Sequence, residues 1–445
     1  MTTKRKTKVA LVSLGCPKNL VDSEKMLGLL AGREIVVGAP MEDADVIVVN
    51  TCGFLGAARE ESLGVIREAL AHKAAGRARR VVVAGCLVNR DGDRIFQDAP
   101  GIDAIVGVND REKIVDAVMG EKTGEKTPRN RTRWEGEDTE RFRLTPKHTA
   151  YLRISEGCSR ECSFCTIPAI RGPFRSKPPQ TVMKEARELI ADGAVELNVI
   201  GQDTTGYGAD LGGGATLAKL LRKLDGLDGV EWIRLLYAYP WGFTQELLEA
   251  MAGCRHVVPY VDVPLQHVST SVLRRMRRGT TRRSIEGLMR NLRAIEGMVI
   301  RTTLIVGFPG ETEEEFRELL AFVKEAKFDA LGVFEYSPEE GTPAAEMRGQ
   351  KPSPVKARRA RQVMLAQQKI AFAANAAVTG SPVTVLVDGL DAAGRCIGRY
   401  YGQAPDIDSV CLLDRPRPAG EFVEGTVTGW DGYDLKVSVG RRNGV

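Results

Sequence analysis

The chain of 445 residues contains 43% hydrophobic and 27% charged residues and carries a formal net charge of +5. This length suggests about three domains, and the composition is that of a globular protein, which excludes a small disulfide-stabilised module and a disordered or fibrous chain. The longest apolar run, residues 81–88, is too short to cross a membrane, so we expect no membrane partner.

Basic residues precede the first apolar run, which covers residues 9–14. This arrangement imitates a lipoprotein signal, but the run is shorter than the hydrophobic region of a signal peptide. We therefore expect a cytoplasmic protein that begins directly with its first strand.

Strand and helix patterns alternate over residues 7–120. Short β-branched runs at 8–14, 45–50 and 80–84 predict strands, and amphipathic segments at 21–30 and 59–71 predict helices. The alternation indicates a parallel α/β domain, in which ligands gather at the carboxyl ends of the strands. Cys16, Cys52 and Cys86 follow the three strands, so we expect their thiols to converge at one edge of the sheet.

Residues 121–147 are charged and rich in Thr, Gly and Pro without periodicity, which predicts a linker or an extended crossing segment. Residues 148–377 alternate again and predict a partial (β/α)6 barrel, whose chemistry lies at the carboxyl ends of the strands. The predicted strands are 150–154, 195–200, 231–236, 259–263, 299–306 and 330–335. The clearest helices are 180–191, 246–252, 284–295 and 313–326, followed by a basic helix over roughly 355–377.

The last segment, 378–445, changes to short strands without helices. Runs at 382–387, 396–400, 409–412, 420–428 and 435–439 predict a small antiparallel β-barrel that is OB-like, a fold that binds RNA or protein. The segment holds nine acidic and seven basic residues, which weakens a purely RNA-binding interpretation.

Basic residues concentrate in two stretches. Residues 348–370 hold seven Lys and Arg without an acidic residue, and residues 274–283 hold six Arg. We expect that such stripes are able to contact RNA phosphates or a ribosomal surface. Solvated helix faces explain them equally well.

The odd number of cysteines, nine, argues against a disulfide framework and for metal or redox chemistry. Cys158, Cys162 and Cys165 lie in the segment GCSRECSFC (157–165), after the first barrel strand. Three thiolates leave one position of a cubane iron–sulfur cluster open to substrate. The alternatives are buried free cysteines and a zinc site, for which His148 is the nearest fourth ligand.

The CxxxCxxC spacing, with Phe164 before the third cysteine, resembles the radical S-adenosylmethionine (SAM) enzymes. The resemblance implies a 4Fe-4S cluster on Cys158, Cys162 and Cys165 whose open iron chelates SAM. The segments 13–19, 50–53 and 84–87 resemble the methylthiotransferases, which hold an auxiliary 4Fe-4S cluster there. The terminal barrel resembles the TRAM module, so the resemblance covers nearly the whole chain.

Within that family, the chain resembles the RimO branch, which methylthiolates the β-carbon of an aspartate in protein twelve of the small ribosomal subunit. The resemblance rests on SLGCPKNLVDSE (13–24), CSFCTIPAIRGPFRS (162–176), GQDTTGYG (201–208), YVDVPLQH (260–267) and FEYSPEEGTPA (334–344). The alternative is the MiaB branch, which modifies isopentenyl-adenosine in tRNA. There we expect Gln after the first cysteine and Asn in place of Asp203. The slightly acidic terminal barrel also suits a basic ribosomal protein.

The resemblance implies that SAM is cleaved at the barrel cluster, that the radical removes a hydrogen from the substrate carbon, and that the N-terminal cluster supplies a methylated sulfur. It also implies a reductant such as flavodoxin or ferredoxin. Sulfur must reach a carbon radical, so we expect both cysteine triads to face one cavity.

Further residues are candidates for cofactor binding. Gly307 and Gly310 resemble a SAM-contacting segment, and the capping-box spacing that follows them is an alternative that is compatible with it. Asp203 is either an acceptor for the SAM amino group or a turn residue. Arg171 is either a bidentate partner for a carboxylate of SAM or substrate, or a surface arginine.

The remaining candidates are less specific. We expect Tyr336 to be a core aromatic rather than a cavity residue, and His267 to be a polar pocket or loop residue without a metal. Cys254, Cys396 and Cys411 lack partner spacing and are expected to be buried hydrophobes. A hypothesis of another class is a non-catalytic, zinc-stabilised RNA-binding protein.

Overall fold

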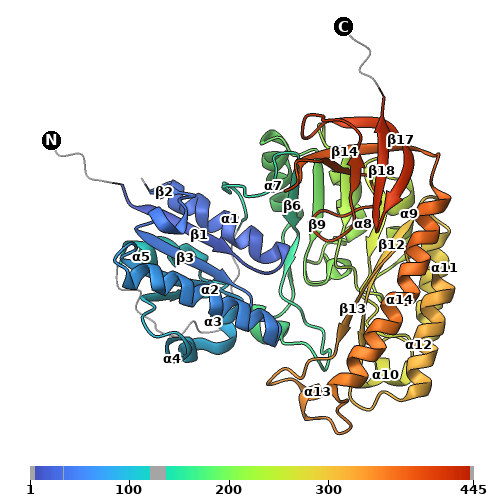
Figure 1. The fold of residues 1–445 in the computed structure, drawn as a ribbon, viewed down its shortest axis with the longest axis horizontal. Helices are drawn as coiled ribbons and strands as arrows, with labels where there is room; N and C mark the ends of the chain where they lie inside the picture. The colour runs from blue at the N-terminus through green and yellow to red at the C-terminus, as the bar shows by residue number, and fades with distance from the viewer. Residues whose placement is uncertain (1–5, 34, 121–136, 441–445) are drawn as a thin grey trace.

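The computed structural model describes residues 6–33, 35–120 and 137–440. An N-terminal α/β domain lies beside a larger α/β barrel, and a small β-barrel covers one end of the latter (Figure 1). Most of the predicted linker, residues 121–136, lies outside the described residues; its remainder, 137–147, runs as an extended segment between the two larger domains. No helix in the described ranges is long and apolar enough to cross a membrane.

The N-terminal domain is built on a parallel sheet with strand order β2-β1-β3-β4-β5. The three predicted strands are confirmed as β1 (Lys8–Ser13), β3 (Val46–Thr51) and β4 (Arg80–Gly85). The edge strands β2 (Val36–Val37) and β5 (Ala104–Val106) were not predicted, because two or three residues show no periodicity. Helices cover both faces: α1 (Pro17–Ala31) and α5 (Ile114–Met119) on one, α2 (Gly56–Ala74) on the other.

Alternate side chains of β3 explain why both faces are covered. Val46 and Val48 pack with the α1 and α5 side, whereas Ile47 and Val49 pack with the α2 side. A strand that buries side chains on both faces reads as a continuous apolar run, and this one is fully buried. Short helices α3 (Cys86–Asp91) and α4 (Ile95–Asp98) follow β4.

The central domain is an open barrel of six parallel strands in the order β13-β12-β11-β10-β9-β6, which confirms the predicted partial (β/α)6 fold. Its strands are β6 (Thr149–Arg153), β9 (Glu196–Ile200), β10 (Trp232–Leu235), β11 (Val257–Asp262), β12 (Val299–Val306) and β13 (Ala330–Glu335). A short antiparallel pair, β7 (Ser155–Glu156) and β8 (Arg175–Ser176), frames the loop after β6.

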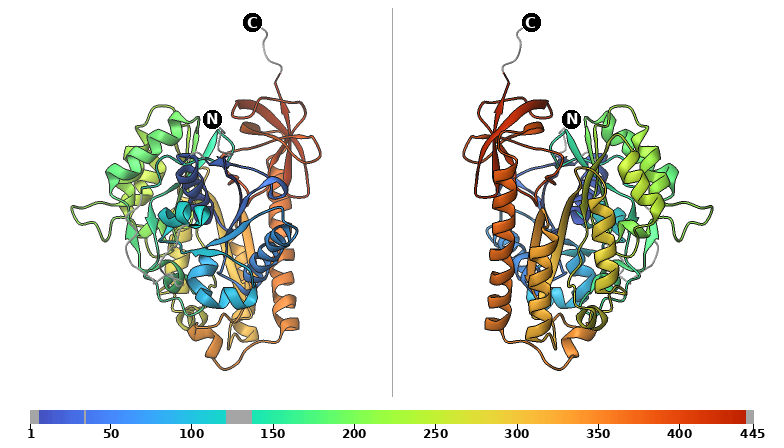
Figure 2. Two further views of the ribbon diagram at one scale, coloured as in Figure 1. Left: turned by 90° about the vertical axis from the view of Figure 1, so that its left-hand side faces the viewer. Right: turned by 90° about the vertical axis from the view of Figure 1, so that its right-hand side faces the viewer.

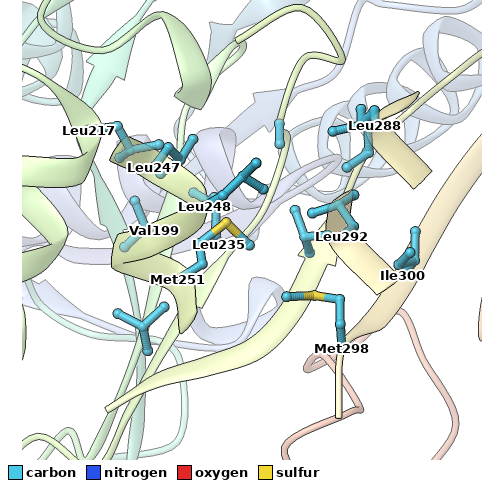
Figure 3. Close-up of a cluster of buried hydrophobic side chains, with 14 of the residues drawn as sticks. Val199, Leu217, Leu235, Leu247, Leu248, Met251, Leu288, Leu292, Met298 and Ile300 are labelled. Atoms are coloured by element: carbon cyan, nitrogen blue, oxygen red, sulfur yellow. The ribbon is translucent and has the colours of Figure 1, made fainter. Parts of the chain in front are cut away.

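The helices of this domain are α6 (Ile167–Arg171), α7 (Pro179–Ala191), α8 (Leu217–Asp225), α9 (Gln245–Gly253), α10 (Thr270–Arg275), α11 (Arg282–Arg293), α12 (Glu313–Ala326), α13 (Pro343–Glu346) and α14 (Ser353–Ala377). The short helix α6 packs against α3 of the N-terminal domain. The longer helices surround the outside of the open barrel. Their apolar faces pack on the sheet; Figure 3 shows Leu217 and Leu247 of α8 and α9 beside Val199 and Leu235 of β9 and β10. Burial of each of these leucine side chains stabilises the folded state by about 1.5–3 kcal/mol.

The N-terminal domain contacts both open edges of this barrel. On the β6 side, Asp22 of α1 forms an ion pair with Arg153, at 2.8 Å. On the β13 side, Glu339 accepts hydrogen bonds from the Gly56 backbone, at 3.0 Å, and from Arg90, at 2.9 Å. The domain therefore bridges the gap that a six-stranded barrel leaves.

The last domain is a closed barrel in the order β14-β15-β16-β18-β17, which confirms the predicted terminal barrel. Its strands are β14 (Pro382–Leu390), β15 (Cys396–Arg399), β16 (Cys411–Leu413), β17 (Phe422–Asp431) and β18 (Asp434–Val439). The pairing is antiparallel except between β16 and β18, which run parallel.

The terminal barrel covers the amino-terminal ends of the central strands. Arg399 pairs with Glu196, the first residue of β9, at 2.8 Å, and Asp408 accepts a hydrogen bond from Tyr260 at 2.6 Å. Figure 2 shows α14 connecting the opposite end of the molecule to this barrel. The terminal barrel therefore lies away from the carboxyl ends of the strands, where the chemistry was expected.

Candidate active site

A cavity of about 440 Å³ lies where the N-terminal domain faces the carboxyl ends of the central strands. Its walls include side chains from the loops after β1, β3, β4, β6, β9, β10 and β11. All six predicted cluster ligands line it: Cys16, Cys52, Cys86, Cys158, Cys162 and Cys165. The expectation that both triads face one cavity is confirmed.

The N-terminal triad is assembled by the topology of the sheet. Cys16 lies three residues after the end of β1, Cys52 directly follows β3, and Cys86 begins α3 after β4. These three strands are neighbours and parallel, so their carboxyl ends meet at one edge. Close packing requires Gly15 there: its φ is +88°, and a Cβ at this position would approach Cys52 Cβ to 2.8 Å.

The barrel triad is held by a loop that bends back on itself. The Cys165 amide donates to the Cys162 carbonyl at 3.1 Å. Backbone amides also face the sulfurs: Arg160 N lies 3.4 Å from Cys158 Sγ, and Ile167 N lies 3.4 Å from Cys165 Sγ. N–H groups that point at thiolates stabilise their negative charge.

Each triad also receives one guanidinium group. Arg171 donates to Cys86 Sγ at 3.4 Å, and Arg278 donates to Cys162 Sγ at 3.4 Å. Arg171 comes from the central domain but reaches a cysteine of the N-terminal domain. It therefore links the two halves of the cavity.

Burial raises the pKa of the cysteine thiols, whereas nearby positive charges lower it. Burial raises the pKa of the Cys86 and Cys165 thiols to about 12. Burial also disfavours the Cys16 thiolate, but the charges of Lys18 and Arg171 outweigh it and lower the pKa of this thiol. Because a cysteine ligand must be deprotonated, cluster binding releases protons from this cavity.

These residues fit two 4Fe-4S clusters. All six thiols are free of disulfides, line one cavity and form two groups of three, which leaves one iron of each cubane without a protein ligand. The zinc alternative is weakened, because His148 precedes β6 whereas Cys158 follows it. The His148 ring instead lies 2.9 Å from Asp388 of the terminal barrel.

Two of the other predicted cofactor-binding residues line the cavity. Phe164 lies beside the barrel triad, and Arg171 is 3% exposed, so the alternative of a surface arginine is wrong. The Arg171 guanidinium pairs with Glu156 at 3.1 Å and with Asp22 at 2.9 Å. These carboxylates accept hydrogen bonds from both Nη atoms of Arg171.

Asp203, Gly307 and Gly310 lie outside the cavity wall. The Asp203 carboxylate pairs with Arg160 at 2.9 Å and accepts a hydrogen bond from the Gly206 amide at 3.1 Å, as a turn residue does. Gly307 has a φ of +72° and packs against Lys356, while the Gly310 amide donates to the Gly349 carbonyl. The capping box of Thr312 and Glu315 is present.

The structure also places the less specific candidates, Tyr336, His267 and the three remaining cysteines. Tyr336 is a core aromatic that packs edge-on against Phe308, with ring centroids 5.2 Å apart. His267 is fully buried and accepts a hydrogen bond from the Ser269 amide at 3.0 Å. Cys396 and Cys411 are buried in the core of the terminal barrel, as expected. Cys254 is only half-buried where it packs against the core of the central domain, so the expectation of a buried residue is wrong for it.

Sequence reasoning missed several residues that line the cavity. Lys18, Gln202, Tyr237, Gln266 and Arg278 all contribute to its wall. The Oε1 atoms of Gln202 and Gln266 are buried and have no hydrogen-bond partner among the described residues. Their positions in the sequence could have identified three of them as cavity residues. Lys18 is two residues from a predicted cluster ligand, and Gln202 and Tyr237 come within two residues of the end of a predicted strand.

The two basic stretches are partly neutralised by acidic residues of α12. Arg275 pairs with Glu315 at 2.7 Å, and Arg359 pairs with Glu313 at 3.2 Å. Arg274, Arg277 and Arg283 remain exposed on the surface. The stretches are therefore less basic than their composition indicates.

Comparison with known proteins gives three matches along the chain. Residues 152–323 match the Radical SAM superfamily, residues 8–107 match Uncharacterized protein family UPF0004, and residues 379–439 match the TRAM domain.

Two similar relatives are both called ribosomal protein uS12 methylthiotransferase RimO. The protein from Geotalea uraniireducens is 44% identical over 98% of this chain and 99% of its own length. The protein from Pelotomaculum thermopropionicum is 45% identical over 96% and 98%. Among solved structures, the radical SAM methyltransferase TsrM from Kitasatospora setae, with cobalamin and a [4Fe-4S] cluster bound, has a TM-score of 0.54 at 15% identity. The match covers 76% of this chain and 74% of that one, and it supports the fold alone.

Proposed function

This chain belongs to the family of the ribosomal protein uS12 methylthiotransferases RimO, and we propose that it attaches a methylthio group to the β-carbon of an aspartate in ribosomal protein uS12. It is a radical SAM enzyme that uses SAM and 4Fe-4S clusters. The single observation that carries the proposal is the presence of two cysteine triads on one cavity wall.

When bound, SAM and the two clusters supply the radical that removes hydrogen from an unreactive carbon and the methylated sulfur that replaces it. The chain itself supplies the geometry. Cys158, Cys162 and Cys165 hold one cluster, and Cys16, Cys52 and Cys86 hold the other. Both triads lie on the same cavity, so the substrate carbon does not need to leave it between the two steps.

Side chains around the triads control their environment. Arg171 and Arg278 each donate a hydrogen bond to one cysteine sulfur, Cys86 Sγ and Cys162 Sγ respectively. Hydrogen bonds to the sulfurs of such clusters set their reduction potentials. Phe54, Phe164 and Ile167 line the wall with apolar surface, which excludes water from a site where a radical is formed.

The SAM-binding roles of Phe164, Asp203, Gly307, Gly310 and Arg171 belong to this proposal. Phe164 and Arg171 are supported by their place on the wall. Asp203, Gly307 and Gly310 would contribute to SAM binding indirectly, because they shape the loops at the carboxyl ends of β9 and β12. Gln202 and Gln266 offer free acceptor atoms that fit the amino group of SAM or a substrate amide.

The domain division belongs to the proposal as well: a methylthiotransferase domain over 7–120, a linker over 121–147, a radical SAM core over 148–377 and a TRAM domain over 378–445. Electrons come from a reductant such as flavodoxin or ferredoxin, and the enzyme acts in the cytoplasm. The exposed arginines Arg274, Arg277 and Arg283 are available for contact with ribosomal RNA.

The test is an anaerobic assay of the reconstituted enzyme with SAM, a chemical reductant and purified uS12. Peptide mass spectrometry should find a methylthio group on one aspartate of uS12. A parallel reaction with isopentenyl-adenosine tRNA should give no product. Product on the tRNA and none on uS12 would select the MiaB-type alternative.

A further inference from the structure

Lys18 is a buried cation in the wall of the cysteine cavity. It lies near the start of α1 and is 7% exposed. Its Nζ is 3.1 Å from the ring centroid of Tyr237, which also lines the cavity. A lysine this buried normally has a charged partner.

The charges of the cavity wall are unbalanced. Its lining residues include Lys18, Arg160, Arg171 and Arg278, whereas no Asp or Glu is found among the lining residues that the structure describes. Apart from the six cysteine thiols, which become negative when they bind a cluster, the part of the wall that the structure describes therefore offers a ligand cationic side chains and no carboxylate.

Three of these four cations already have strong partners. Arg160 pairs with Asp203, at 2.9 Å. Arg171 pairs with Asp22 and Glu156. Arg278 donates to the Pro264 carbonyl at 2.6 Å in addition to Cys162 Sγ.

Neither Lys18 nor Arg278 has a carboxylate within 4.0 Å of its cationic group in the described part of the chain. Arg278 donates to a backbone carbonyl and a cysteine sulfur, whereas the ammonium group of Lys18 lies against the Tyr237 ring. An aromatic ring stabilises a cation but leaves it able to bind an anion on its other side.

The backbone at Tyr237 has a conformation that is unusual for an aromatic residue. Tyr237 has a φ of +58°, which is rare for a bulky residue and persists only where the surroundings enforce it. Its amide donates at 3.3 Å to Oδ2 of Asp262, the last residue of β11. This bond helps to hold the backbone from which the Tyr237 ring extends toward Lys18.

We propose that Lys18 binds the side-chain carboxylate of the substrate aspartate and so determines the specificity of the enzyme for this residue. The inference rests on the proposed function, because methylthiolation at the β-carbon brings the adjacent carboxylate into the cavity. A buried carboxylate requires a cationic partner. In the described part of the chain, Lys18 is the wall cation with neither a carboxylate within 4.0 Å nor a hydrogen bond to a backbone carbonyl, although its charge also favours the Cys16 thiolate.

The test compares the binding of two forms of purified uS12 to the reconstituted enzyme under anaerobic conditions. One form keeps the target aspartate, and in the other asparagine replaces it. We expect the wild-type enzyme to bind the aspartate form roughly 10- to 100-fold more tightly than the asparagine form. This ratio of dissociation constants corresponds to the free energy of one charge-assisted hydrogen bond. In Lys18→Met the ratio should fall to about one, through weaker binding of the aspartate form alone.

Matched variants separate this role from a general loss of charge. Lys25→Met removes a lysine from the same helix outside the cavity and should keep the wild-type ratio. Lys18→Arg keeps the charge and should retain part of the preference. Iron content and SAM cleavage without uS12 should be unchanged in Lys25→Met.

Two results would overturn the proposal. One is an unchanged binding ratio in Lys18→Met. The other is loss of iron from the N-terminal triad in both Lys18→Met and Lys18→Gln, because the lysine would then serve to neutralise the cluster. If the wild type leaves uS12 unmodified, the proposed function itself fails, which is a distinct outcome.

Discussion

The two cysteine triads reach the same cavity by different routes. The barrel triad lies within eight residues of one loop, whereas the N-terminal triad comes from three strands that only the folded sheet brings together. Their arginines differ in the same way. Arg278 is anchored by a backbone carbonyl within its own domain, whereas Arg171 is anchored by buried carboxylates from both domains.

This difference shows which triad depends on the domain interface. Arg111, Arg153 and Lys177 extend the buried network through Asp138 of the crossing segment, with Asp138 contacts of 2.8, 2.7 and 2.7 Å. Breaking the interface should therefore disturb the N-terminal triad and leave the barrel triad intact.

The largest expected effect separates the two triads by their chemistry. Cys162→Ala should abolish reductive cleavage of SAM, because the cluster that binds SAM loses a ligand. Cys52→Ala should keep SAM cleavage within about threefold of wild type but abolish methylthio transfer. Chromatographic measurement of deoxyadenosine checks both, and equal loss of cleavage in the two variants would contradict separate roles.

A second prediction concerns the arginine that crosses the interface. Arg171→Met leaves Glu156 and Asp22 buried without this partner and should lower the free energy of unfolding by about 3–5 kcal/mol. Lys73→Met breaks the more exposed ion pair with Asp103. It should lower the free energy of unfolding by at most about 1 kcal/mol. Urea unfolding of the cluster-free proteins measures both values.

If Arg171→Met were as stable as Lys73→Met, the interface network would have no structural role. Iron analysis gives an independent check of the same variant. The N-terminal cluster should be lost more readily than the barrel cluster.

Acid should weaken the same interface. Burial disfavours the charged form of Glu156, but Arg171 and Arg153 outweigh it and lower the pKa of this carboxyl from 4.5 to about 2. Its stabilising contribution, on the order of 3 kcal/mol, is thus present above about pH 4.5 and is lost as the pH falls toward 2. The stability difference between wild type and Glu156→Gln should shrink over this range.

Urea unfolding of cluster-free protein at a series of pH values measures that difference. A difference that stays constant from pH 5 to pH 2.5 would show that Glu156 is not held ionised by the arginines.

The smallest expected effect tests the turn role of Asp203. Asp203→Asn keeps an acceptor for the Gly206 amide but weakens the pair with Arg160, so stability should fall by about 1 kcal/mol. The KM for SAM should change less than about threefold. A much larger rise in KM, measured by deoxyadenosine formation, would identify Asp203 as a direct SAM ligand.

Much of the fold could be predicted because its signals are local. Apolar runs and helical periodicity predicted β12, β13 and α12 at the residues where they occur. The strand β2 could not be predicted, because its two residues become a strand only by pairing with β1.

The candidate site divides in the same way. The six cysteines follow from their spacing and from the topology of parallel sheets. The contact of Arg171 with Asp22 and the position of Lys18 opposite Tyr237 depend on how two domains pack. No local pattern encodes contacts between residues more than a hundred positions apart.

The central claim is that each triad holds its own cluster, and anaerobic iron and sulfide analysis with electron paramagnetic resonance tests it most directly. The wild type should hold about eight irons, and a variant with Cys16→Ala, Cys52→Ala and Cys86→Ala should hold about four and still cleave SAM. Equal iron in the two proteins would contradict the account, because the N-terminal triad would then bind no cluster.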